Sequence, residues 1–245
     1  MLFLSKKEIP FKDIVPDGYV DIHSHLIPGI DDGVKTMYQS AYILEQFQKL
    51  GVKKVITTPH VLQQIWPNST ETILQKYEEV NSILPTLGIE DIQLKVSAEY
   101  MLDDLFFQRI KEKDILPLHD KYVLVEMSTF SPPMNLNEML FETKLAGYIP
   151  ILAHPERYTF YHKDLKKFDE LKEAGVLFQL NLLSLSGFYG DQVKEFAKKM
   201  IERGYIDFTG SDVHNYQQFM VLEKGFQPKI AEQIKNLMKK NFIFS

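Results

Sequence analysis

The chain has 245 residues, of which 44% are hydrophobic, and this suits one globular domain with a large core. It has no cysteine, which excludes disulfides and every mechanism that uses a thiolate nucleophile. A net charge of −5 argues against a general nucleic-acid-binding protein, because such proteins usually present a basic face. No stretch is apolar for long enough to span a membrane, and the apolar start is too short for a signal peptide, so we expect a soluble cytoplasmic protein.

Strand and helix patterns alternate along the chain after an N-terminal extension, residues 1–18, which we expect to pack on the domain. The expected strands cover residues 19–22, 52–58, 92–98, 122–125, 148–153, 176–180 and 206–209. The expected helices between and after them cover residues 36–50, 70–87, 102–113, 135–146, 164–174, 191–203 and 227–240. This alternation predicts parallel strands with right-handed crossovers. We therefore predict one α/β domain over residues 19–245, a distorted seven-stranded (β/α) TIM-like barrel.

Potential metal ligands lie at the ends of six of the seven expected strands. They are His23 and His25, His60, Glu99, Glu126, His154, and Asp212 with His214. The carboxyl ends of parallel strands in a barrel gather on one face, so we expect these side chains to meet there. Ordinary core histidines would explain one or two of these positions, but not five histidines at successive strand ends. Imidazole and carboxylate ligands suit Mn, Fe or Zn, and the pattern predicts a metal centre.

The same motifs resemble the polymerase-and-histidinol-phosphatase (PHP) superfamily, a distorted barrel that holds up to three metal ions. Asp21-Ile22-His23-Ser24-His25, followed by Pro28-Gly29-Ile30-Asp31-Asp32-Gly33, is similar to a narrower branch. That branch is the manganese-dependent protein-tyrosine phosphatases encoded with bacterial capsule and exopolysaccharide genes. Further matches in the family's order are Thr57-Thr58-Pro59-His60, Ala98-Glu99-Tyr100, Glu126, His154-Pro155-Glu156-Arg157-Tyr158 and Gly210-Ser211-Asp212-Val213-His214-Asn215.

Transferred position by position, the resemblance implies a large set of metal ligands: His23, His25, Asp32, His60, Glu99, Glu126, His154, Asp212 and His214. It implies two to three divalent ions, Mn first, with Fe or Zn as alternatives. It also implies that Glu126 bridges two ions, that Arg157 binds the substrate phosphate, and that Arg157, Glu126 and Asp212 are catalytic. The implied substrate is a phosphotyrosine protein, the tail of a membrane tyrosine kinase that controls polysaccharide export.

The expected chemistry is attack on phosphorus by a hydroxide held between two metal ions, which also bind the non-bridging phosphate oxygens. Arg157 follows His154 by three residues on the expected catalytic face, where a guanidinium can clamp phosphate. A surface ion pair with Glu156 or nearby acids is the alternative for Arg157. Relatives often carry a second arginine after the Asp-x-His motif, but residues 215–219 hold no cation here, so we expect phosphate to be anchored differently.

Several nearby residues have competing interpretations. Asp31 and Asp32 also suit a turn, and we expect Asp32 to be the ligand and Asp31 to be structural. Asp21 either orients an imidazole or begins its strand. The remaining arginines and histidines are expected at the surface: Arg109, Arg203, His119 and His162. Aromatic residues near the expected catalytic loops could form a rim for a phosphotyrosine ring, although most are expected to be packing residues: Tyr100, Tyr158, Phe130, Phe160, Tyr161, Phe188 and Tyr189.

Three other functions stay open at this point. One is a small-molecule phosphatase of the histidinol-phosphate type, and another is a PHP nuclease, which the acidic balance disfavours. The third is a non-catalytic domain with a structural metal, but structural sites are usually closed and four-coordinate, whereas about nine ligands are expected here. We therefore expect a metal-dependent protein-tyrosine phosphatase.

Overall fold

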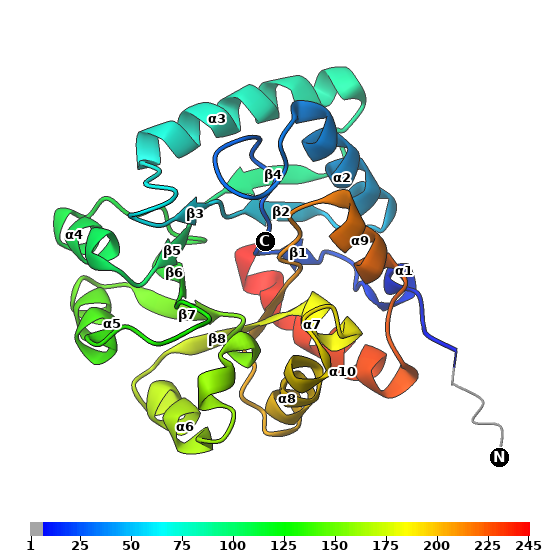
Figure 1. Cartoon of the computed structure of the whole chain (residues 1–245). Coiled ribbons are helices and arrows are strands. Elements are labelled where there is room, and N and C mark those ends of the chain that lie inside the picture. Colours follow the sequence, from blue (N-terminus) through cyan, green and yellow to red (C-terminus); the bar gives the residue numbers. More distant parts are fainter. Residues whose placement is uncertain (1–6) are drawn as a thin grey trace, which may run out of the picture.

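The strands lie at the centre of the computed structural model, which describes residues 7–245, and helices surround them (Figure 1). The described residues form nine strands: β1 (Val20–Asp21), β2 (Lys54–Thr57), β3 (His60–Val61), β4 (Gln93–Val96), β5 (Glu99–Met101), β6 (Tyr122–Glu126), β7 (Ile149–Ala153), β8 (Leu177–Asn181) and β9 (Phe208–Gly210). All neighbouring strands are parallel, in one sheet of order β1-β2-β4 and another of order β3-β5-β6-β7-β8-β9. The predicted parallel α/β fold is therefore confirmed.

Each predicted helix has a counterpart in the structure, and further helices that were not predicted lie at residues 11–14, 182–186 and 216–223. The helices are α1 (Phe11–Ile14), α2 (Met37–Lys49), α3 (Thr70–Ile83), α4 (Asp104–Glu112), α5 (Leu136–Leu145), α6 (Leu165–Glu173), α7 (Leu182–Ser186), α8 (Asp191–Glu202), α9 (Tyr216–Glu223) and α10 (Pro228–Met238). Short 3₁₀ helices are η1 (Leu84–Leu87), η2 (Pro155–Arg157), η3 (Thr159–Tyr161) and η4 (Lys239–Phe244). The side chains of Thr36, Ser69, Asp103 and Asn215 each accept a backbone N–H in the first turn of α2, α3, α4 and α9, which fixes where these helices begin.

A single closed seven-stranded barrel is not what the described residues form. Each of the segments predicted as one strand, 52–58 and 92–98, contains one strand of the first sheet. A short strand of the second sheet begins after a break of two residues. Pro59 lies in the first break and has no N–H to donate to a ladder. At the other junction, between the segments that follow β1 and β9, an isolated parallel bridge joins Ser24 to Val213.

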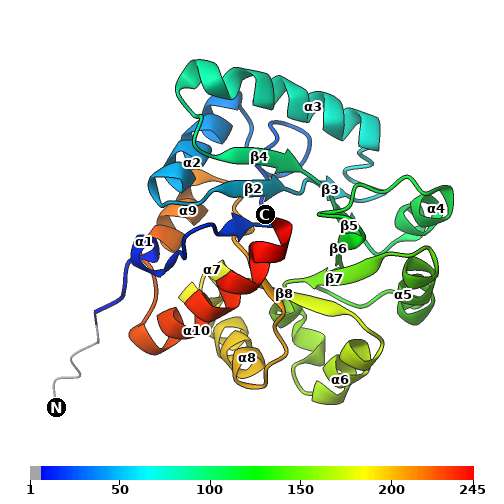
Figure 2. The same ribbon diagram turned by 180° about the vertical axis from the view of Figure 1, so that it is seen from behind.

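Two faces of the strands bury two sets of apolar side chains, because successive residues of a strand point to opposite sides. In β6, Val123 and Val125 belong to the larger core, which includes the apolar faces of the helices, whereas Leu124 belongs to a smaller separate cluster. The smaller cluster also includes Ile151 of β7 and Phe244 of η4. Figure 2 shows the C-terminal segment lying across the back of the sheets. Glu126 follows Leu124 by two residues, so it lies on the same face of β6, at the carboxyl end of the strand.

The described part of the N-terminal extension contacts the connection between α9 and α10. The backbones of Ile9 and Phe226 exchange two hydrogen bonds, of 2.8 and 3.0 Å, and the buried Phe11 ring packs edge-on against the Phe226 ring. Residues 1–6 lie outside the described part. The expected boundary between the N-terminal extension and the domain, at residue 18, stays a prediction. No helix within residues 7–245 has the length and apolar character needed to cross a membrane.

Candidate metal centre

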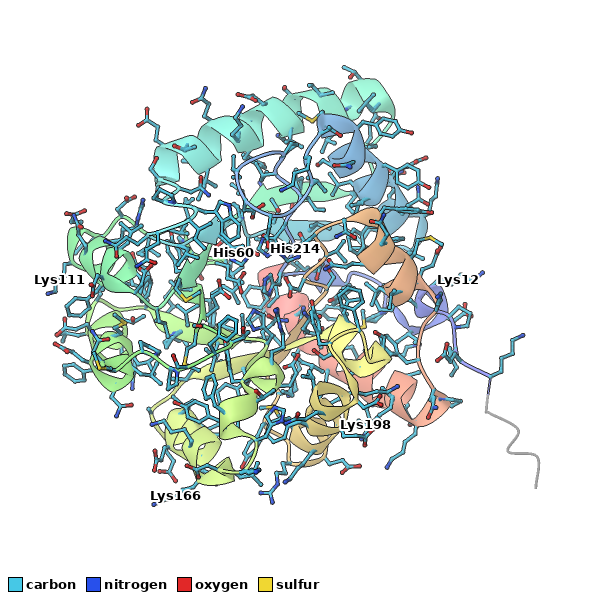
Figure 3. The ribbon with its side chains drawn as sticks, viewed as in Figure 1. Lys12, His60, Lys111, Lys166, Lys198 and His214 are labelled. Atoms are coloured by element: carbon cyan, nitrogen blue, oxygen red, sulfur yellow. The ribbon has the colours of Figure 1, made fainter. Side chains whose placement is uncertain are left out.

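The nine residues implied as ligands all gather at the carboxyl ends of the strands. They form four overlapping groups, and within each group one donor atom per residue lies within 4.8 Å of the others. The groups are His23, His25 and Glu99; His23, His154 and Asp212; His60, Glu99 and Glu126; and His25, Asp32, His60 and His214. Figure 3 shows His60 and His214 near the middle of the molecule, while Lys12, Lys111 and Lys166 lie at its periphery.

The most buried donor atoms form a compact inner set. The Nε2 atom of His23 lies 3.1 Å from Glu99 Oε2, 3.2 Å from Asp212 Oδ1 and 3.3 Å from the Nε2 atom of His25. His25 Nε2 in turn lies 3.4 Å from each of the two carboxylate oxygens. Donor atoms at the corners of a tetrahedron with edges of this length would each lie ~2 Å from its centre, which is the ordinary length of a bond from zinc to nitrogen or oxygen.

A second set lies beside the first and shares Glu99 with it. His60 Nδ1 lies 2.9 Å from Glu126 Oε1 and 3.1 Å from Glu99 Oε2, and His154 Nε2 lies 3.0 Å from Glu99 Oε1. Further out, Asp32 Oδ1 lies 3.4 Å from His60 Nε2 and 3.4 Å from His214 Nε2. Glu126 also lies near a second histidine, because its Oε2 atom is 3.7 Å from His154 Nε2, and its expected role as a bridge between two ions stays a prediction.

Three histidines are held with one ring nitrogen pointing into the centre. His23 Nδ1 contacts the Gln179 carbonyl oxygen at 2.7 Å, and His25 Nδ1 contacts Asp31 Oδ2 at 2.8 Å. His214 Nδ1 contacts the backbone oxygen of Asp212 at 2.9 Å. These oxygens can only accept, so each Nδ1 must carry the proton, and each Nε2 keeps its lone pair for a metal ion.

The charges of the centre suit divalent cations. Five carboxylates gather here, Asp31, Asp32, Glu99, Glu126 and Asp212, against one guanidinium. Burial opposes ionisation of Glu99 and Asp212, yet neighbouring histidines keep the pKa of both carboxyls well below its usual value. Glu99 Oε2 and His60 Nδ1, which lie 3.1 Å apart in the second set, are buried without a well-formed hydrogen bond. Orphaned donor atoms of this kind fit a cation that would bind them.

The histidines differ in how readily they lose a proton. Burial and the Arg157 cation lower the pKa of His154, which favours the neutral imidazole that a metal ligand requires. For His60, burial lowers the pKa, but Glu126 and Glu99 outweigh it and raise the pKa to about 9. Metal ions would therefore compete with a proton at His60.

Tight backbone turns bring these side chains together. His154 and Asp212 adopt left-handed backbone angles, with φ of 36° and 51°, which are uncommon for residues other than glycine. A Cβ on Gly210 would lie 2.6 Å from His23 Cβ, and one on Gly33 would lie 2.3 Å from the His25 backbone oxygen. Glycine is therefore required at both positions for the backbone to lie against the two histidines.

A cleft of about 780 Å³ opens onto the centre, and Arg157 lies in its wall. The Arg157 Nη1 atom lies 3.2 Å from Asp212 Oδ2, and its guanidinium carbon lies 4.4 Å from the centre of the Tyr189 ring. The cleft is also lined by Asp32 and by two loops, 62–66 and 127–130. Arg157 therefore borders the cleft, and it pairs with the nearby acid Asp212 and not with Glu156. Glu156 is fully buried and instead accepts hydrogen bonds from Asn181 N and Ser184 Oγ.

Some sequence-based expectations are wrong. Arg109 is buried, lies 2.6 Å from Asp114 and donates to the Asn68 backbone oxygen. His162 is only partly exposed and stacks on Phe196 at 3.8 Å. For Asp21 the strand interpretation holds: it lies in β1 and its carboxylate accepts from the backbone and hydroxyl of Ser211, with no hydrogen bond to an imidazole within residues 7–245.

The expectations for the other minor residues are confirmed in part. Arg203 and His119 are exposed, as expected. Among the aromatic candidates, Tyr100 and Tyr158 are core residues, whereas Phe130 and Tyr189 line the cleft.

Four residues of the site were missed from the sequence. Asp31 was read as a turn residue, although it supports His25. Gln179 supports His23, and Asn181, on the same face two residues later, donates to Asp212 Oδ2 at 2.6 Å. The ring of Trp66 stacks on His60 at 5.1 Å. The one signal in the sequence for any of these four residues is the position of Asn181 at the end of a predicted strand.

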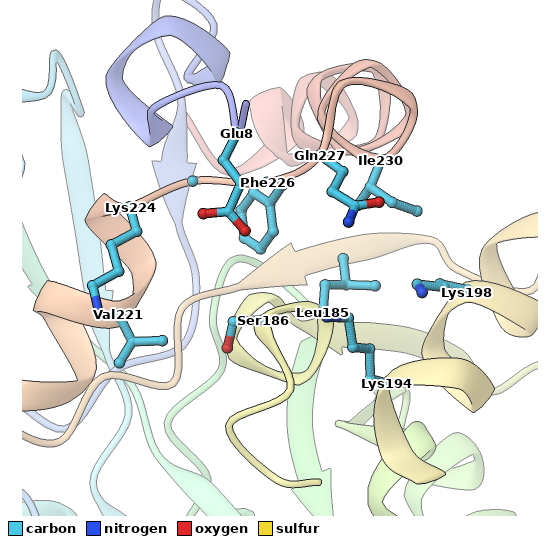
Figure 4. A pocket seen from close by; sticks show the side chains of 11 residues that line it. Glu8, Leu185, Ser186, Lys194, Lys198, Val221, Lys224, Phe226, Gln227 and Ile230 are labelled. Carbon is cyan, nitrogen blue, oxygen red and sulfur yellow. The ribbon is translucent and has the colours of Figure 1, made fainter. Parts of the chain in front are cut away.

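A second hollow, of about 170 Å³, lies between α7, α8 and the connection from α9 to α10 (Figure 4). Lys194, Lys198 and Lys224 line it together with Glu8. It contains none of the nine implied ligands, so the cleft beside Arg157 is the candidate active site.

Comparison with known proteins supplies the family. Residues 19–242 match the family model described as "Capsular polysaccharide synthesis, CpsB/CapC". The chain is 33% identical to CapC of Staphylococcus aureus over 199 residues, covering 80% of this chain and 77% of that protein. It is 29% identical to the tyrosine-protein phosphatase YwqE of Bacillus subtilis over 240 residues, covering 92% of this chain and 93% of that protein.

Solved structures agree with the fold. A structure from the study of YwqE from Bacillus subtilis and CpsB from Streptococcus pneumoniae, described as unique metal-dependent tyrosine phosphatases, matches with a TM-score of 0.77 at 26% identity, over 92% of this chain and 95% of that one. Histidinol phosphate phosphatase from Lactococcus lactis matches with a TM-score of 0.55 at 12% identity, over 92% of this chain and 94% of that one, which supports the fold alone. With a model match over almost its whole length, the chain belongs to the CpsB/CapC family of capsular polysaccharide synthesis proteins.

Proposed function

We propose that this protein is a metal-dependent protein-tyrosine phosphatase. The observation that carries the proposal is the cluster of nine residues with nitrogen and oxygen donors and no thiolate, six of which line a cleft bordered by Arg157. Relatives of this chain named tyrosine-protein phosphatases support the reaction. The nine donors are proposed as ligands of two to three divalent ions, Mn first, with Fe or Zn as alternatives.

The proposed roles follow from the contacts. His23, His25, Glu99 and Asp212 would hold one ion, His60 and His154 would hold the others, and Glu126, which lies near both of these histidines, would bridge two ions. Asp32 and His214 would complete the outer side. Bound divalent ions supply Lewis-acid chemistry, which activates water and neutralises phosphate charge. Arg157 would bind the phosphate oxygens through its remaining N–H groups while Asp212 holds its position.

The leaving group needs little assistance. Tyrosine leaves as a phenolate whose conjugate acid has a pKa near ~10, so protonation matters less than for an aliphatic alcohol. We further propose that the substrate is the tyrosine-rich tail of a membrane tyrosine kinase that controls polysaccharide export, and that the protein acts in the cytoplasm. The family name, which refers to capsular polysaccharide synthesis, supports this substrate.

The test compares substrates side by side. Purified protein loaded with Mn²⁺ is given a phosphotyrosine peptide, histidinol phosphate and duplex DNA, each with and without a chelator. We expect phosphate release from the peptide with a kcat/KM at least tenfold above that for histidinol phosphate, no loss of DNA, and no turnover with the chelator. Preference for histidinol phosphate, DNA degradation, or full activity with the chelator would reject the proposal.

A further inference from the structure

Two large apolar side chains stand exposed at the mouth of the cleft. Ile65 is 61% exposed and Phe130 is 91% exposed, and both line the same cleft as Arg157. By contrast, His154 and Asp212, which also line the cleft, are buried. The cleft therefore has a buried, charged floor, and two exposed apolar side chains stand among the polar residues of its open rim.

The turn that carries Ile65 is fixed by hydrogen bonds. Leu62 and Trp66 exchange two backbone hydrogen bonds of 2.9 Å each, and Ile65 N donates to the Leu62 oxygen. Gln63 N donates to Asp103 Oδ2 at 2.9 Å, which ties the turn to the start of α4. Ile65 is thus exposed on an ordered turn, and holding it there requires little further ordering on binding.

The loop that carries Phe130 is anchored on both sides. Before it, Met127 N donates to the Tyr158 hydroxyl at 2.9 Å, and Phe130 N itself donates to Ser128 Oγ at 3.2 Å. After it come Pro132 and Pro133, whose rings restrict the backbone. Exposed apolar side chains that rim a polar cleft are typical of ligand-binding sites.

We propose that Ile65 and Phe130 bind the aromatic ring of the substrate and so make the enzyme selective for aryl phosphate monoesters on proteins. This inference rests on the proposed function and adds the residues that choose the substrate. A phosphate on tyrosine is separated from the main chain by the ring, so it reaches the buried floor while the peptide stays at the mouth. A serine or threonine ester lacks this spacer, and it would leave both apolar side chains exposed to water.

The test measures binding without turnover. Trp66 is the single tryptophan of the chain and stacks on His60, so its fluorescence reports on the cleft. Phenylphosphonate and methylphosphonate are titrated into Mn²⁺-loaded wild type, Phe130→Ala and Ile65→Ala. We expect wild type to prefer the phenyl compound, and each variant to lose about two- to tenfold of that preference. Affinity for methylphosphonate is expected to stay within about twofold, because it has no ring.

The matched control is Phe141→Ala. Phe141 is 63% exposed on α5 and does not line the cleft, so the same change there is expected to leave the preference unaltered. Steady-state kinetics on phosphotyrosine and phosphoserine peptides give a second readout, with a raised KM for phosphotyrosine in both cleft variants. If both cleft variants match Phe141→Ala while wild type hydrolyses phosphotyrosine, the inference is wrong and the proposed function stands. If wild type hydrolyses no phosphotyrosine, the proposed function itself fails.

Discussion

Replacing Arg157 tests how phosphate is held beside the metal centre. One guanidinium nitrogen, Nη1, lies 3.2 Å from Asp212 Oδ2, and within residues 7–245 the guanidinium has no other hydrogen-bond partner. Arginine carries five N–H donors, so enough remain for a bidentate contact with phosphate. A hydrogen bond between charged groups contributes about 1.5–3 kcal/mol, and a tenfold change corresponds to about 1.4 kcal/mol.

From these values, Arg157→Ala is expected to lower kcat/KM for a phosphotyrosine peptide by about 100-fold or more, since both contacts are lost. Arg157→Lys keeps the charge but not the planar fork, and about a tenfold loss is expected. Arg203→Ala is the control, because Arg203 is exposed at the end of α8, outside the cleft.

The assay is steady-state hydrolysis with metal content measured on every variant. Metal content matters because Asp212 is both the partner of Arg157 and a proposed ligand. If Arg157→Ala retains kcat/KM within twofold of Arg203→Ala, the phosphate-binding role is refuted. If activity falls only in proportion to metal loss, Arg157 supports Asp212 and does not hold phosphate.

Three further changes examine the centre itself. Asp31→Asn removes the anion behind His25 and is expected to weaken metal affinity about 10- to 100-fold by calorimetric titration; unchanged affinity would return Asp31 to a turn role. In Gly210→Ala the new Cβ would lie 2.6 Å from His23 Cβ, so both metal content and Tm should fall, and a variant equal to wild type in both would contradict the required close approach. Burial opposes protonation of His60, but nearby carboxylates raise its pKa to about 9, above the unfolded value of about 6.5. In metal-free protein the stability from this proton is present below pH ~6.5 and lost as pH rises through about 9, while metal affinity rises over the same interval; affinity that is flat with pH would refute this.

The strand ends that carry the candidate ligands could be predicted because each is marked by the point where a run of apolar residues stops. The apolar run that becomes β6 stops at Glu126, and the one that becomes β7 stops just before His154. Parallel strands bring their ends to one face, so the ligand set could be listed without coordinates. The helix predicted over 36–50 likewise matches α2, which Thr36 caps.

What could not be predicted depends on contacts between distant segments. The segment 92–98 gives no sign that Gln93–Val96 and Glu99–Met101 belong to different sheets, because sheet membership is set by pairing with β2 in one case and with β3 and β6 in the other. Support of His23 by Gln179 joins residues 156 positions apart, and a glutamine in a strand carries no local signal of that role. Arg109 looked like a surface residue because helix position alone does not reveal its buried pair with Asp114.

The central claim is that the clustered donors bind several divalent ions on which turnover depends. The most direct measurement is elemental analysis of purified protein, paired with activity after stripping and after adding back Mn²⁺, Fe²⁺ or Zn²⁺ one at a time. The account predicts at least two ions per chain, loss of phosphotyrosine hydrolysis on stripping, and recovery on reloading, with Mn²⁺ most effective. Full activity in the stripped protein, or saturation at one ion per chain, would contradict it.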